Sequence, residues 1–307
     1  MRRLSLFTIL LFPTLLAAAG PESFTFLLQA DSKHKTKTQA VHALRNCQRD
    51  WIILDATYDG TSRWSQSDIQ SIRSARPNRK IICYLSIGEA ETYRPYWHKH
   101  WDTDKDGRPD RGAPAWLDVE NPDWEGNYKV RYWQNAWQEI ILPEIDRIMS
   151  QGFGGLYLDI VDAFEFYEQD KKKYLDNRPN PETGNTYRQD MADWIKRITQ
   201  RATRSKSKPL IIPQNAAQLL AIPSYRQTIS GIGIEDLFTN GKKLKRQKES
   251  DYTLAFINQL KPSGKTVLII DYAKKNKLIA AARDATQRRG FIFLNTDRPL
   301  KTLGQSP

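Results

Sequence analysis

The chain alternates short apolar runs with longer amphipathic segments. Eight apolar runs, rich in β-branched residues, lie at 24–30, 51–57, 80–87, 155–163, 209–215, 231–238, 266–272 and 291–296. Near-continuous apolar runs of this length are typical of parallel strands that are covered on both faces. The pattern therefore predicts eight parallel strands.

Between these runs, apolar residues recur at helical spacing, as Trp133, Trp137, Ile141 and Ile145 do within 130–150. Further helices are predicted at 38–45, 66–75, 186–204 and 278–289. Strands alternating with helices in this number predict an α/β protein, the (β/α)₈ or TIM barrel. An open doubly wound sheet is the alternative. It typically has a glycine-rich turn after its first strand, and residues 29–32 contain no glycine.

One connection is much longer than the others. Residues 88–130, after the third predicted strand, form an insertion rich in Trp, Tyr and Asp. A loop this long inside a compact domain is usually functional. Because it follows a strand, we expect it at the carboxyl-end face, where barrel active sites are built.

The first nineteen residues have the pattern of a cleavable signal peptide. Arg2 and Arg3 precede an apolar run, and small residues follow at 17–19. A membrane anchor is the alternative, but the run is shorter than the roughly 20 apolar residues that span a bilayer. We therefore predict a signal peptide at 1–19, one barrel domain at 20–307, a secreted or periplasmic location and no stable membrane anchor.

The formal net charge is +12, which raises the question of nucleic-acid binding. Its small Lys and Arg clusters, at 242–248 and 274–277, are more typical of solvated faces. Predicted export also argues against a nucleic-acid partner. Cys47 and Cys83 are predicted to be unpaired thiols, although export leaves a disulfide open.

Acidic and amide side chains gather at the predicted strand ends. They are Asp31, Asp55, Glu89, Glu91, Asp159, Asn215, Glu235 and Asp271. Asp159 and Glu235 lie inside runs that would otherwise be core, where a carboxylate is costly unless it is paired or used. A pair of carboxylates is what glycoside hydrolysis requires, and that reaction needs no cofactor. The motifs of serine hydrolases and zinc proteases are missing from the sequence.

Aromatic residues in the insertion fit a sugar-binding role. Trp116 and Trp124 are candidates for contacting the apolar faces of sugars, and packing within the loop is the alternative for both. Trp133 and Trp137, four residues apart on a predicted helix, are expected in the core.

The insertion also contains a segment that resembles the first half of a calcium loop. Asp102, Asp104, Asp106 and Asp110 supply hard oxygens, and Gly107 stands at the turn. Ala113 stands where such loops carry a bidentate Glu, so the match is incomplete. The sequence favours a metal-free turn and leaves calcium as the alternative.

Several motifs together resemble the family 114 glycoside hydrolases. They are YLSIGEAE (84–91), PAWL (114–117), ENPDWEGNYKVRYW (120–133), GLYLDIVDA (155–163) and GIEDLF (233–238). The resemblance covers essentially the whole chain after the signal peptide. It implies a barrel, endo-α-1,4-polygalactosaminidase-like activity, and a catalytic pair formed by a strand-four Asp and a strand-six Glu, here Asp159 and Glu235.

From this we expect a retaining reaction with Asp159 as nucleophile and Glu235 as general acid/base. The predicted substrate-binding residues are Asp31, Asp55, Glu89, Glu91, Trp116, Trp124, Asn215 and Asp271. We expect a polysaccharide substrate and a monomer. A non-catalytic polysaccharide-binding or envelope-assembly protein on the same barrel is the alternative. The positive charge opposes a cationic polymer, so either the acidic face is local or the substrate is neutral or N-acetylated.

Overall fold

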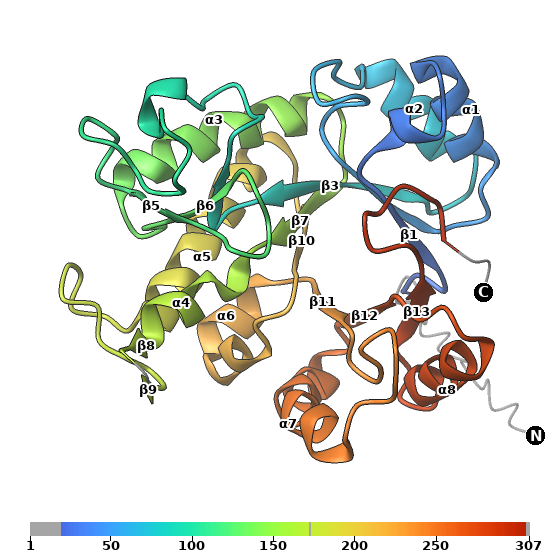
Figure 1. Cartoon of the computed structure of the whole chain (residues 1–307). Coiled ribbons are helices and arrows are strands. Elements are labelled where there is room, and N and C mark those ends of the chain that lie inside the picture. The colour runs from blue at the N-terminus through green and yellow to red at the C-terminus, as the bar shows by residue number, and fades with distance from the viewer. Residues whose placement is uncertain (1–19, 172, 305–307) are drawn as a thin grey trace, which may run out of the picture.

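The computed structural model describes residues 20–171 and 173–304, so the predicted signal peptide lies outside the described residues. Eight parallel strands occupy the centre of the fold, and helices surround them (Figure 1). The strands are β1 (Phe24–Leu27), β2 (Trp51–Leu54), β3 (Lys80–Ser86), β7 (Gly155–Asp159), β10 (Leu210–Pro213), β11 (Gly231–Glu235), β12 (Thr266–Asp271) and β13 (Ile292–Asn295). Each overlaps one of the predicted runs, and the α/β class with parallel strands is confirmed.

The strands pair in chain order. Hydrogen bonds join them into two ladders, β1-β2-β3-β7-β10 and β11-β12-β13. A parallel bridge between Gln214 and Gly233 connects the end of β10 with β11. Strands β1 and β13 also lie next to each other. The carboxyl ends of all eight strands therefore meet on one face of the fold.

Eight α-helices lie among the described residues. They are α1 (Lys37–Asn46), α2 (Gln66–Ser74), α3 (Asn135–Ser150), α4 (Phe164–Glu168), α5 (Tyr187–Ser205), α6 (Pro223–Thr228), α7 (Gln247–Ile257) and α8 (Asn276–Gln287). Polar caps start several of them: Ser65 and Asp68 form a reciprocal capping box on α2. None of the helices in the described ranges is long and apolar enough to cross a membrane.

The hydrophobic core has two parts, divided by the alternation of side chains along the strands. One cluster takes alternate residues of the strands, among them Phe26, Ile53, Tyr157, Ile212 and Ile270. The residues between them join a larger cluster that the helices cover. Successive side chains of a strand point to opposite faces. The face to which a strand residue points therefore decides which of the two clusters it joins.

The predicted insertion is an ordered subdomain rather than a structureless loop. It contains a short 3₁₀ helix, η2 (Lys99–Trp101), and three antiparallel strands in the order β4-β6-β5. These strands are β4 (Glu89–Glu91), β5 (Leu117–Glu120) and β6 (Asn127–Val130).

Helix α3 starts five residues later than predicted, because residues 127–130 pair with β4 and β5 instead. Trp137 is fully buried, as predicted, whereas Trp133 precedes the helix and is only partly buried. Its indole Nε1 donates to Glu182 at 2.9 Å.

The remaining short elements lie near the strand ends or connect helices. The 3₁₀ helices are η1 (Ala30–Ser32), η3 (Val161–Ala163), η4 (Ala217–Ala221) and η5 (Asn258–Ser263), and a two-stranded hairpin is formed by β8 (Gln169–Asp170) and β9 (Lys173–Tyr174). Cys47 and Cys83 are free thiols, as predicted.

Candidate active site

A cleft of about 840 Å³ opens at the carboxyl ends of β3, β7, β10 and β11. Its walls come from these strand ends, from β4–β6, and from residues 298–300 after β13. Asp159 and Glu235, the last residues of β7 and β11, both line it.

Asp159 is held by two donors. The hydroxyl of Tyr84 donates to Oδ2 at 2.6 Å, and the backbone N–H of Ile160 donates to Oδ1 at 2.8 Å. Ile160 has a φ of 57°, a left-handed conformation that is unusual for a β-branched residue and that costs on the order of 1–3 kcal/mol. Such strain is often kept where it aims a functional group, and here it accompanies a backbone donor aimed at the carboxylate.

Burial and the nearby charge of Glu235 raise the pKa of Asp159 to about 8, against the pull of its two donors. Burial thus favours the protonated form of Asp159 in the ligand-free cleft.

Glu235 is held by three side-chain donors. Tyr272 donates its hydroxyl to Oε1, while the amides of Gln214 and Asn215 donate to Oε2 at 2.9 and 3.3 Å. The backbone N–H of Glu235 in turn donates to Oδ1 of Asn215 at 3.1 Å. Three donors on one carboxylate fix its orientation.

Tyr157 lies below the two carboxylates, and the charges of both help to raise its pKa. Its hydroxyl is buried without a hydrogen-bond partner among the described residues. The ring fits because Gly233 lies opposite: a Cβ there would stand 1.8 Å from the hydroxyl oxygen. Asp159 and Glu235 thus both lie close enough to the buried hydroxyl of Tyr157 for their charges to act on it.

The cleft is acidic although the chain is basic. Its lining has eight acids, Glu89, Glu91, Glu120, Asp123, Asp159, Asp162, Glu165 and Glu235, and two bases, Lys129 and Arg298. Burial, and then the charge of Glu165, raise the pKa of Asp162 to about 7, and burial raises that of Glu165. Glu89 and Glu91 have cationic partners, whereas the other six acids of the lining have no ion pair to Lys or Arg among the described residues.

Four of the predicted binding residues line the cleft. They are Glu89, Glu91, Trp124 and Asn215. Trp124 is 54% exposed, so its ring is free to contact a ligand. Glu89 is fully buried and pairs with Lys129 at 2.5 Å. Glu91 accepts from Tyr93 at 2.6 Å and from Arg94 at 2.5 Å. Both acids thus also have a structural role.

The other four predicted binding residues do not line the cleft. Asp271 is fully buried and accepts two bonds from Thr239 at 2.8 Å and one from the N–H of Ala273 at 2.9 Å. Asp271 lies two residues after Ile269 on the same strand, so the two side chains point to the same face. Ile269 belongs to the cluster that the helices cover, and Asp271 therefore faces away from Glu235. The predicted roles of Asp271 in binding and in tuning Glu235 are therefore wrong.

Asp31, Asp55 and Trp116 are absent from the lining for different reasons. Asp31 is exposed on η1. Asp55 pairs with Arg94 at 2.8 Å and accepts from the N–H of Thr57 at 2.9 Å, so it has a structural role. Trp116 is buried between the rings of Trp101 and Trp137, at centroid distances of 5.3 and 5.0 Å. None of the three lines the cleft, and their roles in binding stay predictions.

Sequence reasoning missed the hydroxyl and amide groups that hold the carboxylates. They are Tyr84, Gln214 and Tyr272. The alternation of strand residues was the available signal. Tyr272 points to the same side of the sheet as Leu268 and Ile270, which belong to the cluster below the cleft. Tyr84 points to the same side as Ile82, which also belongs to that cluster.

Comparison with known proteins decides the family. The model of glycoside-hydrolase family GH114 matches residues 35–307. An uncharacterized protein of Deinococcus radiodurans is 34% identical over 273 residues, which cover 88% of this chain and 79% of that protein. An uncharacterized protein of Methanocaldococcus jannaschii is 34% identical over 283 residues, which cover 86% of this chain and 75% of that protein. The chain belongs to glycoside-hydrolase family GH114.

Two solved structures share the fold of this GH114 protein. The glycoside hydrolase domain of PelA from Pseudomonas aeruginosa superposes with a TM-score of 0.64 and 17% identity, covering 94% of this chain and 99% of that one. Ega3 of Aspergillus fumigatus, solved with galactosamine, superposes with a TM-score of 0.65 and 18% identity. The match covers 93% of this chain and 95% of that one. Family membership supports glycoside hydrolase activity and a polysaccharide substrate.

Proposed function

We propose that this GH114 protein is a secreted glycoside hydrolase that cleaves an amino-sugar polysaccharide, as an endo-α-1,4-polygalactosaminidase does. The observation that carries the proposal is a cleft in which Asp159 and Glu235 stand among further acids, most of them without an ion pair to Lys or Arg in the described residues. The proposal includes export through residues 1–19, a closed eight-stranded barrel over 20–307, and a monomer.

The proposed reaction is retaining. Glu235 protonates the glycosidic oxygen while Asp159 attacks the anomeric carbon, which breaks the glycosidic bond and forms a glycosyl-enzyme ester. Glu235 then removes a proton from water, whose oxygen attacks the anomeric carbon and releases Asp159. Retention requires carboxyl groups only about 5–5.5 Å apart. The charge of Glu235 is one cause of the raised pKa of Asp159, which supports the nearness of the two carboxyl groups.

These roles require a proton to move when substrate binds. In the free cleft burial favours the protonated form of Asp159, while Glu235 accepts from three donors. A cationic sugar beside Asp159 would favour its ionised form, because an opposite charge nearby lowers the pKa of a carboxyl. Substrate binding would thereby prepare the nucleophile and leave the proton for Glu235.

Removing the hydroxyl of Tyr84 tests this assignment through pH. That hydroxyl lowers the pKa of Asp159, so Tyr84→Phe raises it further. A nucleophile must be ionised, so the acidic limb of the kcat/KM profile should move up by about 1 pH unit while the alkaline limb stays. Tyr252→Phe, at an exposed position on α7, is the control. Movement of the alkaline limb alone would instead make Asp159 the acid.

The charge of the cleft predicts a preference for free amines. Six of its eight acids have no ion pair to Lys or Arg among the described residues, so an unacetylated galactosamine polymer supplies the cations that they lack. We expect kcat/KM for the deacetylated polymer to exceed that for the N-acetylated polymer by about tenfold or more. The difference should shrink as salt screens the charges. Equal rates on the two polymers would refute the amine preference and leave the hydrolase itself intact.

A further inference from the structure

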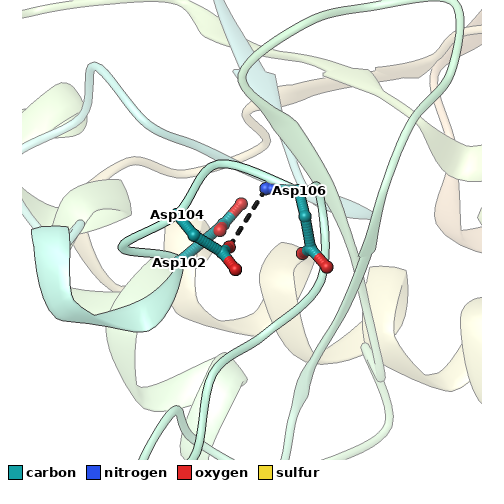
Figure 2. Close-up of side chains that lie close together, drawn as sticks. All are labelled: Asp102, Asp104 and Asp106. Carbon is teal, nitrogen blue, oxygen red and sulfur yellow. Dashed lines mark hydrogen bonds between the residues drawn. The ribbon is translucent and has the colours of Figure 1, made fainter.

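Three carboxylates gather in the segment between η2 and β5. Oxygens of Asp102, Asp104 and Asp106 lie within 4.8 Å of one another (Figure 2). Asp102 leads out of η2, and Gly107, with a φ of 79°, turns the chain after Asp106. Three like charges at such distances repel one another unless a cation lies among them.

Asp102 supplies an independent observation. Its side chain belongs to a residue only 7% exposed. Oδ2 accepts from the N–H of Gly107 at 3.1 Å and from the hydroxyl of Tyr128, but the buried Oδ1 has no hydrogen-bond partner among the described residues. A buried carboxylate oxygen without a partner costs free energy. No ion pair to Lys or Arg offsets the charge of these three residues in the ranges that the structure describes.

We propose that Asp102, Asp104 and Asp106 bind one calcium ion. Calcium takes six to eight oxygen ligands in flexible geometry, so three carboxylates can be completed by carbonyl oxygens and water. Magnesium demands a near-ideal octahedron and suits such a loop less well. Asp110, the fourth residue of the sequence motif, is not among the three clustered carboxylates, and its Oδ2 accepts from the N–H of Thr103 at 2.7 Å, so the proposal does not include it.

The site would brace one wall of the cleft. The carbonyl of Gly107 accepts from the N–H of Glu120 at 2.8 Å, and Tyr128 connects Asp102 to β6. Glu120, Asn127 and Lys129, on β5 and β6, line the cleft. Calcium would therefore couple the stability of this subdomain to the shape of the cleft.

Terbium luminescence tests the proposal without any enzymatic assay. Trp101 adjoins Asp102 and would sensitise Tb³⁺ held at the site. We expect one Tb³⁺ per chain, displaced by calcium with a Kd between about 10⁻⁵ and 10⁻³ M. Because Asp104 and Asp106 are exposed, the Asp104→Asn, Asp106→Asn double variant should fold and lose affinity at least tenfold. Asp110→Asn, in the same loop, is the matched control and should bind as wild type.

A second readout is thermal stability. Calcium should raise the Tm of the wild type and of Asp110→Asn relative to the chelated protein, and leave that of the double variant unchanged. Absence of saturable Tb³⁺ or calcium binding by the folded wild type would overturn the proposal. So would a double variant that binds as tightly as the wild type. Neither result bears on the hydrolase activity.

Discussion

Replacing Asp159 with Asn is expected to lower kcat on the polymer by a factor on the order of 10⁴, with the fold intact. An amide cannot form the ester that the proposed reaction requires. Asn keeps one of the two oxygens, so it can still accept from the N–H of Ile160 while its NH₂ group donates to the hydroxyl oxygen of Tyr84, and the local structure should persist. Burial raises the pKa of Asp159, so the neutral amide suits the site better than a charge does.

The measurement is kcat from the release of reducing ends, with circular dichroism and Tm to confirm folding. Asp193→Asn makes the same chemical change at an exposed position of α5 and should leave kcat within about twofold of the wild type. A folded Asp159→Asn protein with undiminished cleavage would remove Asp159 from the mechanism.

Replacing Glu235 with Gln is expected to lower kcat on the polymer by about 10²- to 10⁴-fold. The size of the loss should depend on the leaving group. A sugar alkoxide leaves only when it is protonated, whereas an activated aryl glycoside needs no acid to depart. We therefore expect the bond-breaking step to be nearly unaffected for the activated substrate.

Burst kinetics on the activated substrate separate the two steps, because release of the aryl group precedes hydrolysis of the ester. Glu125→Gln, exposed and outside the cleft lining, is the matched control. An equal loss in the first step for both substrates would show that Glu235 is not the general acid.

The eight strands could be predicted because each is a buried apolar run, and burial on both faces leaves a strong local signal. The residue at which α3 begins could not be predicted in this way. Helical spacing of apolar residues continues back to residue 130, but residues 127–130 satisfy their backbone bonds with β4 and β5. That pairing depends on segments far along the chain, which a local pattern does not contain.

The candidate pair was found because Asp159 and Glu235 interrupt apolar runs at strand ends. Asp271 was misplaced because being at a strand end does not fix the face to which a side chain points. The side chain of its neighbour Tyr272 points to the opposite face, where its hydroxyl donates to Glu235. Asp55 was misplaced because its partner, Arg94, lies 39 residues away and meets it only in the fold.

The charge of the cleft is a third property that the sequence alone did not reveal. The chain carries a formal net charge of +12, which argued against a cationic substrate, yet the cleft gathers eight acids and two bases. Net charge is a sum over the whole surface, whereas a bound sugar responds mainly to groups within about a Debye length. Only the fold shows which charges those are.

The most direct test is reducing-end release from deacetylated α-1,4-galactosamine polymer by the chain from residue 20 onward, beside its Asp159→Asn variant. Hydrolysis predicts sustained release by the wild type and almost none by the variant. If both folded proteins bind the polymer and neither releases reducing ends, the protein is a polysaccharide-binding member of its family and the proposed hydrolase is wrong.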